Sequence, residues 1–162
     1  MYKPLSLRRP FLFFDDHNEV YQCDANDLAE QVKAEVVYLD PPYNHRQYID
    51  CYHLPENIML WEKPDTFGKT KKFRRDHLKS DYSRVSGAHK AFAELIGKLQ
   101  CQHIFLSYNS EGIIPDKDII AILKARGKVE IFEKQYPIFG HGAGVAKKRP
   151  VMERLFYVRV RR

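Results

Sequence analysis

The chain has 162 residues, of which 44% are hydrophobic and 30% charged, and its formal net charge is +6. This length and composition predict one globular domain over residues 1–162 with a real core, and they exclude two ordinary domains. No apolar run approaches the roughly 20 residues that span a bilayer, and no signal peptide is evident, so we expect a cytoplasmic protein. The positive charge permits a polyanionic partner but does not identify one.

Cysteine and histidine usage argues against a metal site. The cysteines Cys23, Cys51 and Cys101 are odd in number, widely spaced and without a Cys-x-x-Cys pair. Such spacing encodes neither a disulfide framework nor a zinc site, so we expect reduced, partly buried thiols. His53 and Glu56 are too few to hold a metal without further ligands.

The first part of the chain predicts a strand, a helix and a second strand. We expect a short strand over residues 20–23 and a helix over residues 24–32, which begin with the capping residue Asp24. The apolar run over residues 35–39 then predicts a buried strand. Together they would form a βαβ unit with a right-handed crossover, which would bring Asp24 to the same sheet edge as the end of the second strand.

That second strand ends in the sequence Asp40-Pro41-Pro42-Tyr43. Because proline has no N–H to donate, the strand must stop at Asp40, at the carboxyl edge where open α/β sheets bind ligands. The Asp40 carboxylate and the Pro41 carbonyl can accept the two N–H groups of an exocyclic amine, while the Tyr43 ring stacks on its base. These four residues therefore suit a planar base that carries an amine.

Asp40-Pro41-Pro42-Tyr43 resembles the catalytic motif of the amino-group DNA methyltransferases. The run that follows is similar to their adenine-specific branch in restriction-modification systems, through Asn44, Arg46, Gln47 and Tyr48. The resemblance implies S-adenosylmethionine as the methyl donor and adenine N6 in double-stranded DNA as the target. It also implies a Rossmann-like α/β fold of the S-adenosylmethionine-dependent methyltransferase type.

The resemblance further implies roles for individual residues. Asp40, Pro41 and Tyr43 would orient the flipped adenine, and Asp24 would lie near the cofactor together with Asp40. Asp is also a preferred helix cap, so Asp24 has an equally simple structural explanation. DNA-binding roles are implied just after the motif, for Asn44 and Arg46.

Residues 63–90 form a basic insertion and a candidate DNA-facing segment. They contain nine Lys or Arg and three Asp, with Phe67, Phe73 and Tyr82 interleaved. Basic side chains contact phosphates and aromatic side chains stack on bases, although a solvated charged loop has a similar composition. The pattern favours nucleic acid without separating DNA from RNA, and the expected phosphate contacts are Lys71, Lys72, Arg74 and Arg75.

The other elements follow from apolar periodicity. Pro55 predicts irregular chain at residues 53–54 and a helix only over residues 56–61. Further along, helices are expected over residues 87–99 and 115–125, and strands over residues 103–108, 128–133 and 151–160. The resulting sheet is mainly parallel with an antiparallel last strand. A glycine-containing loop precedes that strand and offers further candidate phosphate contacts, Lys147, Lys148 and Arg149.

The resemblance runs from about residue 24 to residue 160 and matches only the carboxyl-terminal part of such an enzyme. In this branch the glycine-containing cofactor motif precedes the Asp-Pro-Pro-Tyr strand, but no glycine occurs before residue 24. We therefore expect an incomplete fold, with an apolar sheet edge and half of a cofactor pocket exposed. On its own the chain is expected not to methylate.

Several interpretations of such a partial chain stay open. It can be one polypeptide of a split enzyme, in which an upstream polypeptide supplies the cofactor motif. It can equally be a truncated, inactive remnant or a nucleic-acid-binding module without catalysis. From another class, the same motif can serve an amine methyltransferase that acts on RNA.

Overall fold

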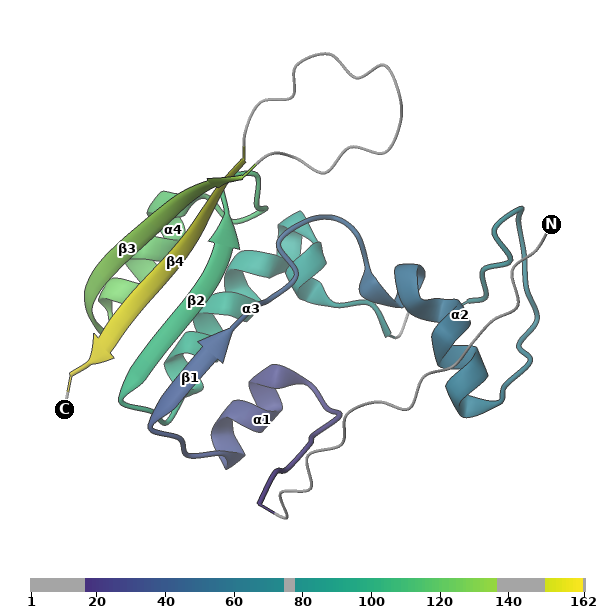
Figure 1. Cartoon of the computed structure of the whole chain (residues 1–162), viewed down its shortest axis with the longest axis horizontal. Helices are drawn as coiled ribbons and strands as arrows, with labels where there is room; N and C mark the ends of the chain where they lie inside the picture. Colours follow the sequence, from purple (N-terminus) through teal and green to yellow (C-terminus); the bar gives the residue numbers. More distant parts are fainter. Residues whose placement is uncertain (1–16, 75–77, 137–150, 162) are drawn as a thin grey trace.

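The computed structural model describes residues 17–74, 78–136 and 151–161. Its sheet has four strands in the order β1-β2-β4-β3, with bounds β1 Val36–Leu39, β2 His103–Asn109, β3 Gly127–Tyr136 and β4 Val151–Val160 (Figure 1). β1 is parallel to β2, and β4 is antiparallel to both β2 and β3. Three strands thus share one direction and the last strand runs against them, as expected. Because one pairing is parallel and two are antiparallel, the sheet is mixed.

Helices α3 (Val85–Lys98) and α4 (Asp116–Lys124) cover one face of the sheet (Figure 1). Each buries one apolar side, because its apolar residues recur at helical spacing. On the sheet, alternate residues of β2 and β4 point toward these helices. The largest fully buried side chains of this core are Phe92, Ile96, Ile104, Leu106, Tyr108, Ile119, Leu123, Phe156 and Val158.

The expected strand over residues 20–23 is wrong. These residues are not in a strand, and Val20 is 96% exposed. A strand needs a neighbour for its backbone hydrogen bonds, and none of the described strands lies beside this segment. The chain enters helix α1 (Ala25–Gln31) directly, so the described structure contains no βαβ unit at this point.

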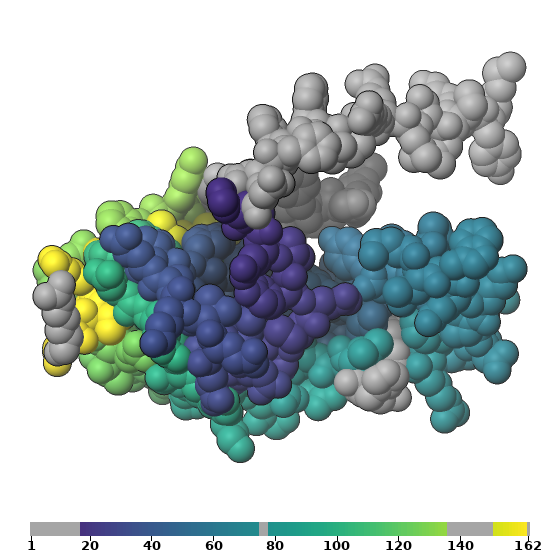
Figure 2. Space-filling view, turned by 90° about the horizontal axis from the view of Figure 1, so that it is seen from below, coloured from purple at the N-terminus to yellow at the C-terminus, as the bar shows by residue number. Residues whose placement is uncertain are grey.

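Helix α2 (Tyr48–Leu60) also differs from the expectation. It runs through Pro55 without interruption, whereas the sequence predicted irregular chain before that residue. Proline removes one hydrogen bond, to the carbonyl four residues back, and the rest of the helix continues around this gap. α2 has no buried residue. A hairpin over residues 67–72 follows it, and the two form a lobe at the end of the molecule far from β3 (Figure 2).

The remaining elements agree with the sequence within a few residues at each end. A short 3-10 helix, η2 (Asp81–Ser83), precedes α3. Cys23 and Cys51 are exposed, so only Cys101 has the expected partial burial. Within the described ranges no helix is long and apolar enough to cross a membrane, and no cluster of metal-ligating side chains is present. The glycine-containing loop before β4 lies outside these ranges.

Two glycines offer a matched test of the packing after β2. An added Cβ at Gly112 would lie 2.1 Å from Cε1 of Tyr108, a ring that is only 2% exposed, whereas one at Gly97 in α3 meets nothing within 4 Å. Gly112→Ala should lower the free energy of unfolding by about 1–3 kcal/mol through overpacking. Gly97→Ala should raise it by about 0.5–1 kcal/mol. Urea titration measures both, and equal stability of the two variants would contradict this packing.

Candidate active site

The candidate site lies where β1 ends. Asp40, Pro41, Pro42 and Tyr43 follow this strand directly and form a loop. The turn after β2 contacts this loop and fixes its position. The N–H of Ile113 donates to the carbonyl oxygen of Tyr43 at 2.8 Å. The Tyr43 ring meets the Tyr108 ring edge to face, with centroids 6.1 Å apart. The loop is thus fastened to the neighbouring strand although its prolines cannot join the sheet.

A cleft of about 840 Å³ opens beside this loop. Its wall comes from the end of β1, the start of α1, the inward side of α2 and residues 78–82. Asp24, Asp40 and Pro41 all line it, so two acidic residues and the first proline of the motif share one cavity. Its size falls within the range of roughly 300–1,000 Å³ that is usual for small-molecule sites.

Asp24 has a structural role as well as a place on the cleft. It is the N-cap of α1, and its Oδ1 accepts the N–H of Asn26 at 2.8 Å. A carboxylate has about four lone-pair positions, so this bond leaves acceptor capacity for a ligand. Asp24 therefore faces the same cavity as Asp40, although the strand expected before it is absent.

The other residues that the motif suggested lie outside this lining. Tyr43 is half-buried beside Tyr108, and burial raises the pKa of its phenol. Asn44 Oδ1 accepts the N–H of Arg46 at 2.9 Å, which shapes the turn into α2. The Arg46 side chain is exposed. The structure thus gathers Asp24, Asp40 and Pro41 at the cavity, whereas Tyr43, Asn44 and Arg46 are not part of its lining.

Sequence reasoning did not reveal the structural role of Gln47. Its side chain is buried and bonds both polar groups of one backbone residue: Nε2 donates to the carbonyl of Ser80 at 2.9 Å, and Oε1 accepts its N–H at 2.8 Å. Next to it, Ser83 Oγ donates to the carbonyl of Arg46. These bonds fix one wall of the cleft to the start of α2. They join residues about 33 positions apart, so local periodicity could not reveal them.

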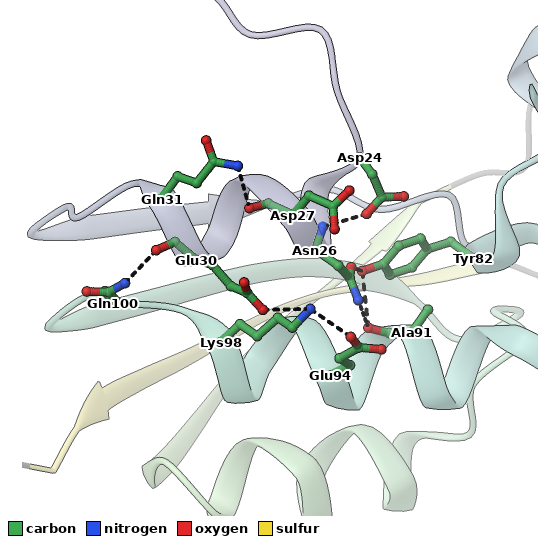
Figure 3. A network of polar contacts seen from close by, with 10 residues as sticks. All are labelled: Asp24, Asn26, Asp27, Glu30, Gln31, Tyr82, Ala91, Glu94, Lys98 and Gln100. Atoms are coloured by element: carbon green, nitrogen blue, oxygen red, sulfur yellow. Dashed lines mark hydrogen bonds and ion pairs between the residues drawn. The ribbon is translucent and has the colours of Figure 1, made fainter.

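A polar network holds α1, and with it Asp24, against α3 (Figure 3). The Tyr82 hydroxyl donates to Oδ1 of Asn26 at 2.6 Å, and Asn26 Nδ2 donates to the carbonyl of Ala91 at 3.0 Å. About two helical turns further along α3, Lys98 pairs with two acidic residues, Glu30 at 2.9 Å and Glu94 at 2.7 Å. Burial, followed by the charge of Asp24, raises the pKa of Tyr82.

The basic insertion divides into parts with different surroundings. Phe67 and Lys72 pair across a tight hairpin, in which Lys71 has a φ of 53°, and Lys72 Nζ lies 4.0 Å from Asp50 of α2. Phe73 lines the cleft and Arg74 is exposed, whereas Arg75 lies outside the described residues. At the end of the insertion Tyr82 is buried and residues 85–90 belong to α3, so the insertion is not one continuous loop. Its contact with DNA stays a prediction.

The fold is an α/β domain in which the Asp-Pro-Pro-Tyr loop and a second acidic residue, Asp24, line one cleft. Together with the family match of the sequence, this defines a methyltransferase domain. The chain belongs to the D12 class N6 adenine-specific DNA methyltransferase family, whose sequence model matches residues 3–122. No solved structure matches it.

Three relatives agree with this assignment. The chain is 41% identical to the modification methylase StsI of Streptococcus sanguinis, over 91% of this chain and 23% of that protein. It is 43% identical to the type II methyltransferase M.FokI of Planomicrobium okeanokoites, over 71% and 18%, respectively. Identity to M.NlaIII of Neisseria lactamica is 40%, over 85% and 41%. The chain therefore spans less than half of each of these relatives.

The buried hydroxyl of Tyr82 should make stability depend on alkaline pH. Its pKa is raised in the folded state, so folding favours the neutral phenol; this stabilisation is complete below the unfolded pKa of about 10 and is lost as the pH rises above it. Tyr82→Phe should lower the free energy of unfolding by about 1 kcal/mol at pH 7. The difference in free energy of unfolding between the parent and Tyr82→Phe should become smaller above pH ~10, by up to about 1.4 kcal/mol per pH unit. Urea titrations from pH 7 to 11 test this, and a difference that does not change with pH would contradict it.

Proposed function

We propose that this chain is the part of an S-adenosylmethionine-dependent DNA adenine-N6 methyltransferase that positions the target amine. The observation that carries the proposal is the shared cleft of Asp24, Asp40 and Pro41 at the end of β1. Membership of the D12 family and the three methylase relatives support it. Restriction-modification is the corresponding biological setting, and duplex DNA is the macromolecular partner.

The proposed chemistry needs few groups from the protein. The Asp40 carboxylate and the Pro41 carbonyl accept the two N–H groups of the adenine amine and so hold its nitrogen in one orientation. As the N–C bond forms, positive charge develops on that nitrogen, and the Asp40 carboxylate stabilises it. The proton leaves after methyl transfer, so no base with a raised pKa is required. Tyr43, held edge-on by Tyr108, supplies an aromatic face for the flipped base.

The lining of the cleft fits the proposed methyl donor. Asp24 and Asp40 offer carboxylate oxygens to the ammonium, amine and hydroxyl groups of S-adenosylmethionine, and Leu39 and Leu95 offer apolar wall. When bound, S-adenosylmethionine supplies the methyl group. The glycine-containing turn of the cofactor motif is not found before Asp24, so we propose that a further polypeptide segment contributes it. Alone, the chain would bind the donor in a poorly defined position. Because correct positioning of the reactants lowers the activation barrier by roughly 7–11 kcal/mol, the chain alone is expected not to methylate.

The catalytic roles can be tested in a complemented assay. The chain would be co-expressed with the portion of M.NlaIII that lies outside its match, and labelled methyl transfer to duplex DNA measured. Asp40→Ala should lower the rate by at least about 100-fold, because it removes the group that stabilises the developing charge. Tyr43→Phe keeps the ring and should retain most activity.

Three outcomes would separate the alternatives. Equal rates of Asp40→Ala and the parent would refute the assignment. Methylation of RNA in place of DNA would favour the RNA amine methyltransferase. DNA binding without transfer in any combination would leave a nucleic-acid-binding module or an inactive remnant.

The hairpin is proposed to contact DNA phosphates. Replacing Lys71, Lys72 and Arg74 together by Ala should weaken binding to all duplex sequences and reduce the slope of log K against log salt by about 0.9 for each lost phosphate contact. Fluorescence anisotropy with labelled duplexes at several salt concentrations measures this. The matched control removes the same charge from α4 and β3, at the opposite end of the molecule (Figure 1), through Lys117, Lys124 and Lys128. Equal slopes for the two triple variants would mean that the hairpin does not contact DNA and is a solvated loop.

A further inference from the structure

We propose that the sheet face opposite α3 and α4, called the outer face, carries a second binding site, which takes a small molecule with a phosphate monoester group. The site is a cavity of about 720 Å³ at the start of β3 and the end of β4. Its polar lining consists of Gln102, Lys128, Glu130, Tyr157, Arg159 and Arg161. These residues are separate from the lining of the cleft that holds Asp24 and Asp40.

The first observation is the charge pattern of the two strands at the cavity. Three rows of the ladder between β3 and β4 join two charged residues, and two of these rows oppose an acid to a base: Glu133 with Arg154 and Lys134 with Glu153. The third row joins two cations, Lys128 and Arg159. Like charges directly opposite each other destabilise a sheet, and an anion bound between them removes the repulsion. The pattern therefore indicates an anion site at this row.

The cations of the cavity have little compensation from acidic side chains. Lys128 Nζ lies 3.6 Å from Glu130, but both side chains are exposed, so this ion pair contributes little. Within the described residues, no carboxylate forms an ion pair with Arg159 or Arg161. Three cations and one carboxylate leave a formal surplus of two positive charges. A phosphate monoester carries about two negative charges at neutral pH, and the planar guanidinium of arginine matches its oxygens.

One wall of the cavity is an aromatic ring that its neighbours hold in place. The Tyr157 ring stacks with Phe105 at 4.9 Å between centroids and with His103 at 5.9 Å. A hydrogen bond of 2.9 Å also joins the Tyr157 hydroxyl and Nδ1 of His103. A ring fixed in this way loses little conformational freedom when a ligand packs against it. Because a bare phosphate is much smaller than the cavity, the ligand carries an organic body that packs on this wall.

The backbone of duplex DNA fits this surface less well than a small phosphate ester. Duplex binding needs cations along an extended stripe, since each contact neutralises one phosphate. Here the row of Lys128 and Arg159 continues through His103 to the apolar Val36, and the next row of β3 carries Glu130. β3 also stands at the end of the molecule opposite α2 and the hairpin (Figure 1). The positive charge is thus confined to the cavity.

The test uses phenyl phosphate as the probe, because it joins a phosphate monoester to an aromatic ring and contains no adenine for the cleft. An NMR titration of the whole chain at pH 7.5 and low salt measures its affinity. Arg159→Gln and Arg161→Gln should each weaken binding at least about tenfold, because each removes a charge-assisted hydrogen bond. Lys117→Gln removes the same charge from an exposed position of α4, on the other face of the sheet, and should change the affinity less than about twofold.

Thermal unfolding adds a readout that separates binding from folding. Without phosphate, Arg159→Gln should raise the midpoint of unfolding, because it removes the repulsion from Lys128. Added phenyl phosphate should then stabilise the parent more than the variant. A lower midpoint of the variant without phosphate would mean that Arg159 stabilises the free chain, and this would overturn the proposal.

Two further probes test the two parts of the ligand. Inorganic phosphate should bind at the same residues but at least about threefold more weakly, because it lacks the ring that packs on Tyr157. Phenol that binds as tightly as phenyl phosphate would overturn the proposal, and so would equal affinities of Arg159→Gln and Lys117→Gln for the probe.

The remaining outcomes place the probe or the site elsewhere. Asp40→Ala should bind phenyl phosphate as the parent does, and a loss of binding in this variant would assign the probe to the cleft and overturn the proposal. Duplex DNA that displaces phenyl phosphate, and that binds Arg159→Gln more weakly than the parent, would overturn it in favour of a nucleic-acid contact.

Discussion

The structure depends on how the chain is held after β1 ends. Two consecutive prolines cannot pair with the sheet, so the loop that carries Asp40 must be fixed by contacts on its far side. The turn after β2 supplies them, through the hydrogen bond from Ile113 to Tyr43 and the edge-on contact of Tyr43 with the buried Tyr108. The residues that end the strand, Asp40, Pro41 and Pro42, thereby become part of the wall of a cleft.

A second set of long-range bonds brings the other carboxylate to the same cleft. Tyr82, Asn26 and Lys98 tie α1 to α3 and η2, and this attachment fixes Asp24 although no strand precedes it. The Gln47 side chain adds two hydrogen bonds to the backbone of Ser80, which connect residue 80 to the start of α2. The walls of the cleft thus come from segments far apart in the sequence, joined mostly by side chain to backbone bonds.

The sheet that supports this site is asymmetric. Its inner face is filled by α3 and α4, while its outer face is charged over β3 and apolar over β1, where one edge is unpaired. The chain also spans less than half of three methylases in its family.

The sequence by itself determined the local structure. Apolar spacing identified α3, α4 and β3, apolar runs identified β1 and β2, and the proline pair located the end of β1, because these signals depend on neighbouring residues alone. The tertiary structure decided the rest: residues 20–23 found no strand to pair with, α2 continued through Pro55, and Tyr82 was buried in a network. The partners of Gln47 and Asn26 lie 33 to 65 positions away, so only the folded chain could bring them together.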